Sequence, residues 1–304
     1  MGKLFKNLKP YWKSVLVIVV LLVVQAFCDL SLPQYTSDII DTGIQNSGVE
    51  HILPEKITAE EFQNAQLFMT ADEQKTWQDA YSGDGDLLDR NDFSKKDLEQ
   101  FDSDLIVPIL LNYQMSMMSE DSFREMLMQQ QQGNPQAAEQ LKTMSIADIG
   151  KSMGVTLTPF ERTEEDDNGN KTTVTCVDVR PLFAAMQEAG QFTEETRSEM
   201  RSQLETMLDT MGESLVQSMG IAYAVQCDQA AGLDTDKIQT NYLWAAGGKM
   251  IAIAFAMMAV TICISYVAAR VGAGVGRDLR KKVFSRVMQF SNAEMDQFST
   301  ASLI

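Results

Sequence analysis

The sequence predicts a mainly α-helical membrane protein, in which two long transmembrane helices flank a mostly helical extracytoplasmic domain with one β-hairpin. Three observations predict this fold class: two long apolar runs, basic residues on their outer flanks, and an acidic segment between them. The 304 residues carry a formal net charge of −17, and residues 46–241 hold 36 acidic against 14 basic side chains. This acidity excludes a basic nucleic-acid-binding protein.

The first apolar run predicts a transmembrane helix near the N-terminus. Residues 15–24 are all apolar, and the run continues to residue 32 with Asp29 as its only charge. At about 1.5 Å of rise per residue, this run nearly crosses a hydrocarbon core of roughly 30 Å. A secretory signal peptide is the alternative. It is disfavoured because no small-residue cleavage site follows and Phe27 precedes Cys28.

The second apolar run, residues 244–269, predicts a second transmembrane helix. It has no charged residue from position 250 to position 269. A buried helix of a soluble protein would be expected to show a polar stripe. Here Thr261, Ser265 and Tyr266 are the main polar interruptions, so a membrane span is the better interpretation.

Basic residues on the outer flanks of both runs predict that both chain ends are cytoplasmic, because Lys and Arg are retained on that side. These residues are Lys3, Lys6, Lys9 and Lys13 before the first run, and Arg270, Arg277, Arg280, Lys281, Lys282 and Arg286 after the second. We therefore expect a multi-pass protein of the cell (plasma) membrane, in contact with the lipid bilayer, with residues 46–235 extracytoplasmic.

The segment between the runs is too long for a structureless loop and has helical patterning. Thr58 with Glu61, and Thr70 with Glu73, have the spacing of helix-initiating capping boxes. Weaker helix starts are Ser94, Ser145 and Thr193. The expected helices cover residues 59–69, 71–81, 95–117, 121–131, 145–152, 181–189, 194–211 and 213–230.

One β-hairpin is expected within this helical segment. Residues 155–162 and 171–179 are rich in β-branched side chains, and residues 166–170 between them read Asp-Asp-Asn-Gly-Asn. Asn and Gly in this arrangement favour a tight turn between two antiparallel strands.

The four cysteines divide between the predicted compartments. Cys28 and Cys263 lie within the apolar runs, whereas Cys176 and Cys227 lie in the extracytoplasmic segment. A disulfide between Cys176 and Cys227 would join the hairpin to the last helix of that segment, but spacing alone leaves two unpaired buried thiols as the alternative.

No metal site or catalytic set is expected. A group of methionines resembles a soft-metal thioether site: Met115, Met117, Met118, Met126 and Met128. Methionine is also the adaptable filler of helical cores, and no Cys or second His joins the group. With His51 as the single histidine, which we expect in a surface loop, no Ser/His/Asp or Cys/His set can form.

Two further patterns fail as binding sites. Residues 84–89 hold three Asp, but Leu88 stands where a calcium loop needs an oxygen ligand, so a solvated acidic loop is expected. Residues 150–152 end like a phosphate-binding loop, but Ser145 occupies the place of its first Gly. We therefore expect no cofactor-binding residues in this chain.

Polar residues within the first span have a functional interpretation. Gln25 and Asp29 are expensive in hydrocarbon, so they are candidates for a translocation path, although Asp29 also fits an ordinary place at the outer interface. Gly272, Gly274 and Gly276 follow the second span and would expose a helix backbone for close packing. A nucleotide-binding fingerprint would need a preceding strand, which is absent from the pattern.

Several runs at the two ends of the chain are specific in sequence. They are KPYWK at 9–13, LP at 32–33, SDIIDTGI at 37–44, AARVG at 268–272, RDLRKKVF at 277–284, FSNAEMD at 290–296 and FSTASLI at 298–304. Together they resemble the type 1 transmembrane domain of bacterial ABC exporters of the multidrug half-transporter type. The resemblance does not extend across residues 50–230.

This resemblance implies a division of the chain. Its parts are a cytoplasmic elbow helix (1–13), the first transmembrane helix with its outer extension (14–45), an extracytoplasmic insertion domain (46–235), the second transmembrane helix with its cytoplasmic extension (236–290), and the start of the first intracellular coupling region (291–304). It implies coupling roles for Asp296, Phe298, Ser299 and Thr300. Because the family needs further spans and an ATPase domain, we expect the N-terminal part of a longer polypeptide.

The function that the resemblance implies is ATP-driven export of an amphipathic, drug-like or peptide-like substrate. The implied partners are a second half-transporter, identical or different, and a nucleotide-binding domain that holds ATP and Mg outside this chain, which by itself should not hydrolyse ATP. The alternative is a two-span membrane receptor with an extracytoplasmic ligand-binding domain. A receptor should continue as a heptad repeat after residue 269, which the glycines and FSNAEMD interrupt. A tethered binding protein or an adhesion module also remains open.

Overall fold

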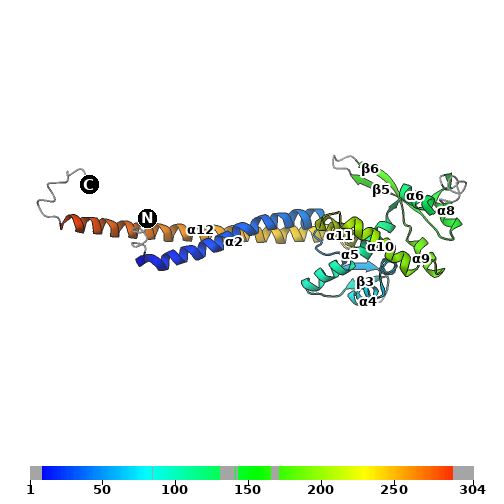
Figure 1. The fold of residues 1–304 in the computed structure, drawn as a ribbon, viewed down its shortest axis with the longest axis horizontal. Helices are drawn as coiled ribbons and strands as arrows, with labels where there is room; N and C mark the ends of the chain where they lie inside the picture. Colours follow the sequence, from blue (N-terminus) through cyan, green and yellow to red (C-terminus); the bar gives the residue numbers. More distant parts are fainter. Residues whose placement is uncertain (1–8, 84, 131–140, 142, 166–170, 290–304) are drawn as a thin grey trace. The chain divides into compact units, whose positions relative to one another are not determined.

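The computed structural model describes residues 9–83, 85–130, 141, 143–165 and 171–289 (Figure 1). The chain folds as two units. One, here called the terminal unit, comprises Met1–Ile40 and Leu243–Ile304, and the other, the central domain, comprises Asp41–Tyr242. As expected, the described chain is mainly helical; it also contains two small sheets, where one hairpin was expected.

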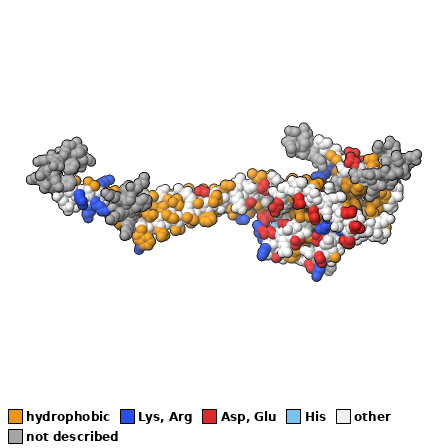
Figure 2. Space-filling model, viewed as in Figure 1, with side chains coloured by type: hydrophobic (Ala, Val, Ile, Leu, Met, Phe, Trp, Pro, Cys, Tyr) orange, Lys and Arg blue, Asp and Glu red, His pale blue; other side chains and the backbone are white. Residues whose placement is uncertain are grey.

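Two long helices dominate the terminal unit. A short 3-10 turn, Lys9–Tyr11, leads into α2, Trp12–Asp38, and the second helix is α12, Thr235–Val287, which begins in the central domain. By length and composition both are able to cross a membrane, and none of the residues in their most apolar windows is buried. Figure 2 shows hydrophobic side chains along these helices.

Tyr11 connects the start of α2 to the far end of α12. Its hydroxyl donates a hydrogen bond to Asp278 Oδ2 at 3.0 Å. A Cβ on Gly274 would lie 2.6 Å from the Tyr11 hydroxyl oxygen, whereas nothing lies within 4 Å of such an atom on Gly272 or Gly276. The expected helical glycines are confirmed, and the close packing is made by Gly274 alone among these three.

One side of the central domain contains a small sheet that the sequence pattern did not predict. Its antiparallel strands are β1 (Lys56–Thr58), β2 (Tyr81–Ser82) and β3 (Leu87–Arg90), in the order β1-β3-β2. Helices α3 (Ala59–Gln66) and α4 (Ala71–Ala80) connect the first two strands. The expected solvated loop at 84–89 is therefore wrong for residues 87–89, which lie in β3 and pair with β1; Asp84 lies outside the described residues.

The other side contains the expected hairpin as part of a second sheet. Strands β5 (Pro159–Glu165) and β6 (Lys171–Val177) pair antiparallel, and β4 (Met118–Ser119) adds to β6. The surrounding helices are α5 (Lys95–Ser116), α6 (Glu120–Gln130), α8 (Ile146–Ser152), α9 (Arg180–Glu188), α10 (Glu194–Leu208) and α11 (Glu213–Ala230).

Two hydrophobic clusters stabilise the central domain. The Trp77 core includes Ile52, Ile57, Trp77, Leu105 and Tyr223, and the Phe183 core includes Phe68, Leu110, Phe123, Leu182 and Phe183. Helix α5 supplies buried residues to both cores, and α11 packs against α5. The central helix α5 thus joins the two halves of the domain.

Helix starts follow the local signals closely. Thr70 with Glu73 and Ser94 with Asp97 form complete capping boxes. At Thr58 only half of the box forms: the hydroxyl accepts the backbone N–H of Glu61, but the Glu61 carboxylate points elsewhere. Each expected helix is found within a few residues of its expected bounds. At the starts of α3, α4 and α5, a short polar side chain satisfies a free N–H group of the first turn, whereas α9 and α11 begin without a side-chain cap.

A tight loop precedes the central domain's first strand. After the π-helical turn Ile39–Gln45, the backbone at Gly48 is left-handed, with φ of +81°, and its amide donates to the carbonyl of Thr42 at 2.7 Å. A Cβ on Gly48 would lie 2.9 Å from Gln239 Cα in the first turns of α12. Gln239 also donates its side-chain amide to the carbonyl of Gly43 at 2.8 Å.

We predict that Gly48→Ala lowers the free energy of unfolding of the central domain by about 3 kcal/mol. Left-handed backbone costs an L-residue about 1 to 2 kcal/mol, and the backbone clash at Gln239 adds an overpacking cost of similar size. Gly232→Ala is the matched control, because Gly232 has φ of +82° but nothing within 4 Å of the added Cβ.

The measurement is urea denaturation of the full chain in detergent, followed by fluorescence of the buried Trp77 after Trp12 and Trp244 are replaced by Phe. Equal losses for the two glycine variants would contradict the close approach at Gln239.

Candidate functional site

The structure describes two of the residues that the sequence analysis assigned to transport, Gln25 and Asp29. Gln25 and Asp29 lie one turn apart on the same side of α2, where Gln25 is partly exposed and Asp29 is exposed. The coupling candidates Asp296, Phe298, Ser299 and Thr300 lie outside the described residues. No described contact brings Gln25 or Asp29 to a partner that would define their role.

The disulfide considered for the extracytoplasmic segment is absent from the described residues. Cys176 lies on β6, opposite Phe160 of β5 and Ser119 of β4, whereas Cys227 lies on α11 and packs in the Trp77 core. Both residues are buried, as the alternative required, but they are not joined.

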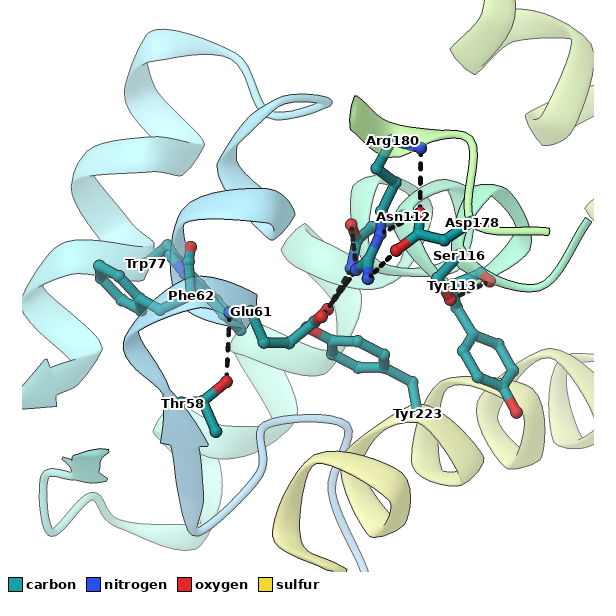
Figure 3. A network of polar contacts seen from close by, with 10 residues as sticks. All are labelled: Thr58, Glu61, Phe62, Trp77, Asn112, Tyr113, Ser116, Asp178, Arg180 and Tyr223. Atoms are coloured by element: carbon teal, nitrogen blue, oxygen red, sulfur yellow. Dashed lines mark hydrogen bonds and ion pairs between the residues drawn. The ribbon is translucent and has the colours of Figure 1, made fainter. Parts of the chain in front are cut away.

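A buried arginine organises the most polar site of the central domain (Figure 3). Arg180 Nη1 donates to both Glu61 carboxylate oxygens at 2.7 Å, and Nη2 and Nε donate to Asp178 at 2.8 and 3.0 Å. Asn112 donates to Glu61 at 2.8 Å and accepts from Arg180 at 3.3 Å. Tyr223 donates its hydroxyl to Glu61 at 3.1 Å. Four helices thus contribute to one network: α3, α5, α9 and α11.

Local structure places these side chains where they meet. Thr58 caps α3 and sets Glu61 in its first turn, so the carboxylate is free to reach away from the cap. Asp178 precedes α9 by two residues and accepts the backbone N–H of Arg180 at 3.0 Å. Pro181 then continues the first turn of α9, where its missing N–H costs nothing. Asp178 and Arg180 are therefore oriented by the same short segment.

The electrostatics of the network favour fixed charges. Burial alone would lower the pKa of Arg180, but hydrogen bonds and charges from Asp178 and Glu61 outweigh burial, and the pKa is raised. Burial, then the nearby Cys227 and Glu61, raises the pKa of Tyr223 well above its usual value. Burial and the Glu61 charge likewise raise the pKa of Cys227. The Cys227 sulfur therefore stays a protonated thiol at neutral pH and is a poor nucleophile.

A cavity of about 330 Å³ adjoins this network. Glu61, Asp178 and Arg180 are its charged lining residues among those described, and Met117 and Phe160 supply apolar wall. Two carboxylates face one guanidinium, so the lining repels anions and suits a small ligand that donates hydrogen bonds. The described lining residues include no activated nucleophile, so binding is the chemistry that this arrangement supports.

Asp228, which follows Cys227 of the Trp77 core, is a fully buried acid. Its Oδ1 accepts the backbone N–H of Lys56 at 2.8 Å, while its Oδ2 is buried without a hydrogen-bond partner. The pKa of Asp228 is raised to about 6, mainly by burial. The Lys56 N–H lowers this pKa, the Glu55 charge raises it, and the Arg90 charge lowers it. Asp228 therefore titrates in a range where an ordinary aspartate is already ionised.

The other sequence-based candidates resolve as follows. Within the part of the chain that the structure describes, no group of three or more His, Cys, Asp or Glu side chains could hold a metal ion. His51 lies in a loop, but its side chain is only 12% exposed and its Nδ1 lies 2.7 Å from Asp102 Oδ2, so the expected surface position is wrong. Residues 150–152 lie in α8, and the Lys151 ammonium is 3.8 Å from Asp148.

The methionines that are grouped in the sequence do not share one site in the fold. Met115 and Met126 line a separate apolar cavity, whereas Met117 accepts a hydrogen bond from Arg162 at 3.2 Å and lies beside the network cavity. Arg180 and Glu61 were missed because both sit in local patterns, a helix start and a capping box, that gave no sign of a contact over 119 positions of sequence.

Comparisons of this chain with protein-family models, with curated proteins and with solved structures give no match.

We predict that Arg180→Met costs the central domain about 3 to 5 kcal/mol, because it leaves the Glu61 charge without its partner in a largely buried position. Lys237→Ala is the control, since Lys237 forms an exposed pair with Asp234 and its loss should change the stability little. The Trp77 fluorescence assay measures both.

Adding Glu61→Gln to Arg180→Met should recover part of the loss, because it removes the less exposed of the two carboxylates that Arg180→Met leaves unpaired, and only Asp178 then lacks its partner. A cost for Arg180→Met no larger than that for Lys237→Ala would show that the network does not support the domain.

We predict that the raised pKa of Asp228 makes the free energy of unfolding depend on pH. Because its folded pKa is raised above the usual 3.8 to about 6, the protonated form favours folding. The stability that Asp228 contributes is complete below about pH 3.8 and is lost as the pH rises through about 6. Relative to Asp228→Asn, wild-type protein should lose about 2 to 3 kcal/mol between pH 4 and pH 7.

The measurement compares urea midpoints of the two proteins at pH 4, 5, 6 and 7. Parallel curves would mean that Asp228 titrates normally.

Proposed function

We propose that this chain is the N-terminal part of the transmembrane domain of an ATP-driven ABC exporter that moves an amphipathic, drug-like or peptide-like substrate out of the cell. The observation that carries the proposal is helix α12, which is continuous over 53 residues from Thr235 to Val287. A membrane crossing uses about 20 residues of a helix. Helix α12 is therefore much longer than one crossing, and it extends on both sides of the apolar run 244–269. Its last part is basic, with Arg270, Arg277 and Arg280.

In this proposal α2 and α12 are spans of the plasma membrane, both chain ends are cytoplasmic, and residues 46–235 lie outside. The distribution of charge along the sequence supports this orientation, because basic residues precede the first apolar window and follow the second, whereas the acidic segment lies between the two windows. The Tyr11–Asp278 hydrogen bond then lies in the cytoplasmic part of the terminal unit. It raises the pKa of Tyr11 and lowers that of Asp278, which keeps the bond charge-assisted at neutral pH.

The described residues of this chain do not fit ATP. The one segment that resembles the end of a phosphate-binding loop, residues 150–152, is helical and follows no strand directly. We therefore assign ATP and Mg to a nucleotide-binding domain outside these residues, and a second half-transporter to the partner position. Within this chain, Tyr11 and Gly274 hold the cytoplasmic end of α12 against the start of α2.

A two-span membrane receptor is the second candidate, because the cavities of the central domain also fit an extracytoplasmic ligand-binding role. The reading frame after Ile304 separates the two functions. Further hydrophobic spans and a phosphate-binding loop support the exporter, whereas a heptad-rich output module supports the receptor.

For the exporter, we predict that Gly274→Leu lowers ATP-dependent transport several-fold. The added side chain would displace the Tyr11 ring and break its hydrogen bond to Asp278. Gly272→Leu is the matched control on the same helix, because nothing lies within 4 Å of a Cβ at Gly272. The assay is quenching of Hoechst 33342 fluorescence in inside-out vesicles that contain the product of the natural reading frame.

Wild-type vesicles should show quenching that depends on ATP and Mg and is blocked by vanadate. No ATP-dependent change in wild-type vesicles would contradict export of an amphipathic dye. Equal transport by the two leucine variants would remove the role assigned to the Tyr11 contact.

A further inference from the structure

A separate cavity of the described central domain lies apart from the Arg180 network. It has a volume of about 720 Å³, which is within the range of about 300 to 1,000 Å³ that drug-sized ligands occupy. Helices α5, α6, α9 and α10 contribute its walls. Five methionines line it: Met115, Met126, Met153, Met186 and Met200.

The lining of this cavity has a buried apolar part and an exposed polar edge. Leu127, Leu182 and Phe183 are buried and form the apolar inner part, whereas Gln191 and Gln203 are exposed at its edge. Phe183 is held by edge-to-face contacts with Phe68 and Phe192, at ring-centroid distances of 5.5 and 5.3 Å. A fixed aromatic ring therefore lies behind flexible methionine side chains, which adapt to ligands of different shape.

None of the described residues that line this cavity is charged. The contrast with the rest of the segment is large, because residues 46–241 contain 36 acidic and 14 basic side chains. An ion placed here would lose its hydration without gaining a counter-charge, which costs several kcal/mol. The walls therefore select against charge, and the amides of Gln191 and Gln203 offer neutral hydrogen bonds at the edge.

We propose that this methionine-lined cavity is a binding site of the central domain for an uncharged ligand that consists mainly of hydrocarbon. The hydrocarbon part contacts the methionines and Phe183, and a neutral polar group such as a hydroxyl contacts Gln191 or Gln203. The inference stands on the cavity alone and needs neither ATP nor a transport partner. Its failure would leave the exporter proposal untouched.

Photolabelling of the full chain in amphipol tests the site. The probe is dodecanol with a diazirine in its alkyl chain, and the comparison probe is dodecanoate with the same diazirine, which differs by its negative charge. Mass spectrometry maps the adducts. Labelling of the lining segments of α5, α6, α9 and α10 is normalised to labelling of the apolar part of α12. We expect dodecanol to label the lining segments at least tenfold more than dodecanoate, and excess unlabelled dodecanol to compete.

Two variants on α10 form a matched pair. Met200→Lys places a positive charge in the cavity wall and should reduce the dodecanol-to-dodecanoate ratio at least tenfold. Met207→Lys places the same charge on an exposed residue of the same helix outside this cavity, and the ratio should change less than twofold. Ala185→Phe fills the cavity without adding charge and should lower labelling by dodecanol at least fivefold.

Trp77 fluorescence checks that each variant is folded. Labelling confined to α2 and α12 would overturn the proposal, as would equal ratios for the two lysine variants. If Met200→Lys fails to fold, undiminished labelling of folded Ala185→Phe would also overturn it.

Discussion

The central domain depends on the pairing of one buried guanidinium. Arg180 is only 9% exposed at its side chain, and its charge is matched by Glu61 and Asp178. Burying two opposite charges gains little over burying apolar groups, but an unmatched partner would be expensive. The network therefore acts mainly as a geometric constraint. Glu61 of α3 and Asn112 of α5 contact Arg180, and Tyr223 of α11 contacts Glu61, so the network constrains how these helices meet around Arg180.

Features of the fold that depend on residues close together in the sequence could be predicted, whereas contacts between distant residues could not. Helix starts at Thr70 and Ser94 are encoded within four residues: the expected capping box forms at Thr70, and a complete box also forms at Ser94, where only a weaker helix start was expected. Glu73 completes its box and also binds Arg201 at 2.6 Å, so the local prediction holds although a distant partner is present. Glu61 has the same local pattern, but its carboxylate binds Arg180 instead. Whether such a glutamate completes its capping box or binds a distant arginine depends on tertiary packing. The local sequence pattern does not distinguish the two cases.

The elements that were not predicted share a physical cause. Strands β1, β2, β3 and β4 have only two to four residues, too few for a clear alternating pattern, and each pairs with a neighbouring strand that supplies its hydrogen bonds. The methionines were likewise grouped by sequence distance, whereas the fold separates Met117 from Met115 and brings Met186 and Met200 to Met115. His51 was placed at the surface because no partner is near it in sequence, although Asp102 binds it.

The cavity at the Arg180 network and the methionine-lined cavity constrain a ligand in different ways. At the Arg180 network, two carboxylates exclude anions by charge, whereas the described methionine-lined walls exclude any ion through the cost of dehydration. Neither lining favours a negatively charged molecule, and the net acidity of residues 46–241 acts in the same direction at long range. A ligand of this domain should therefore be neutral or cationic. That requirement follows from the side chains themselves and applies equally to an exporter and to a receptor.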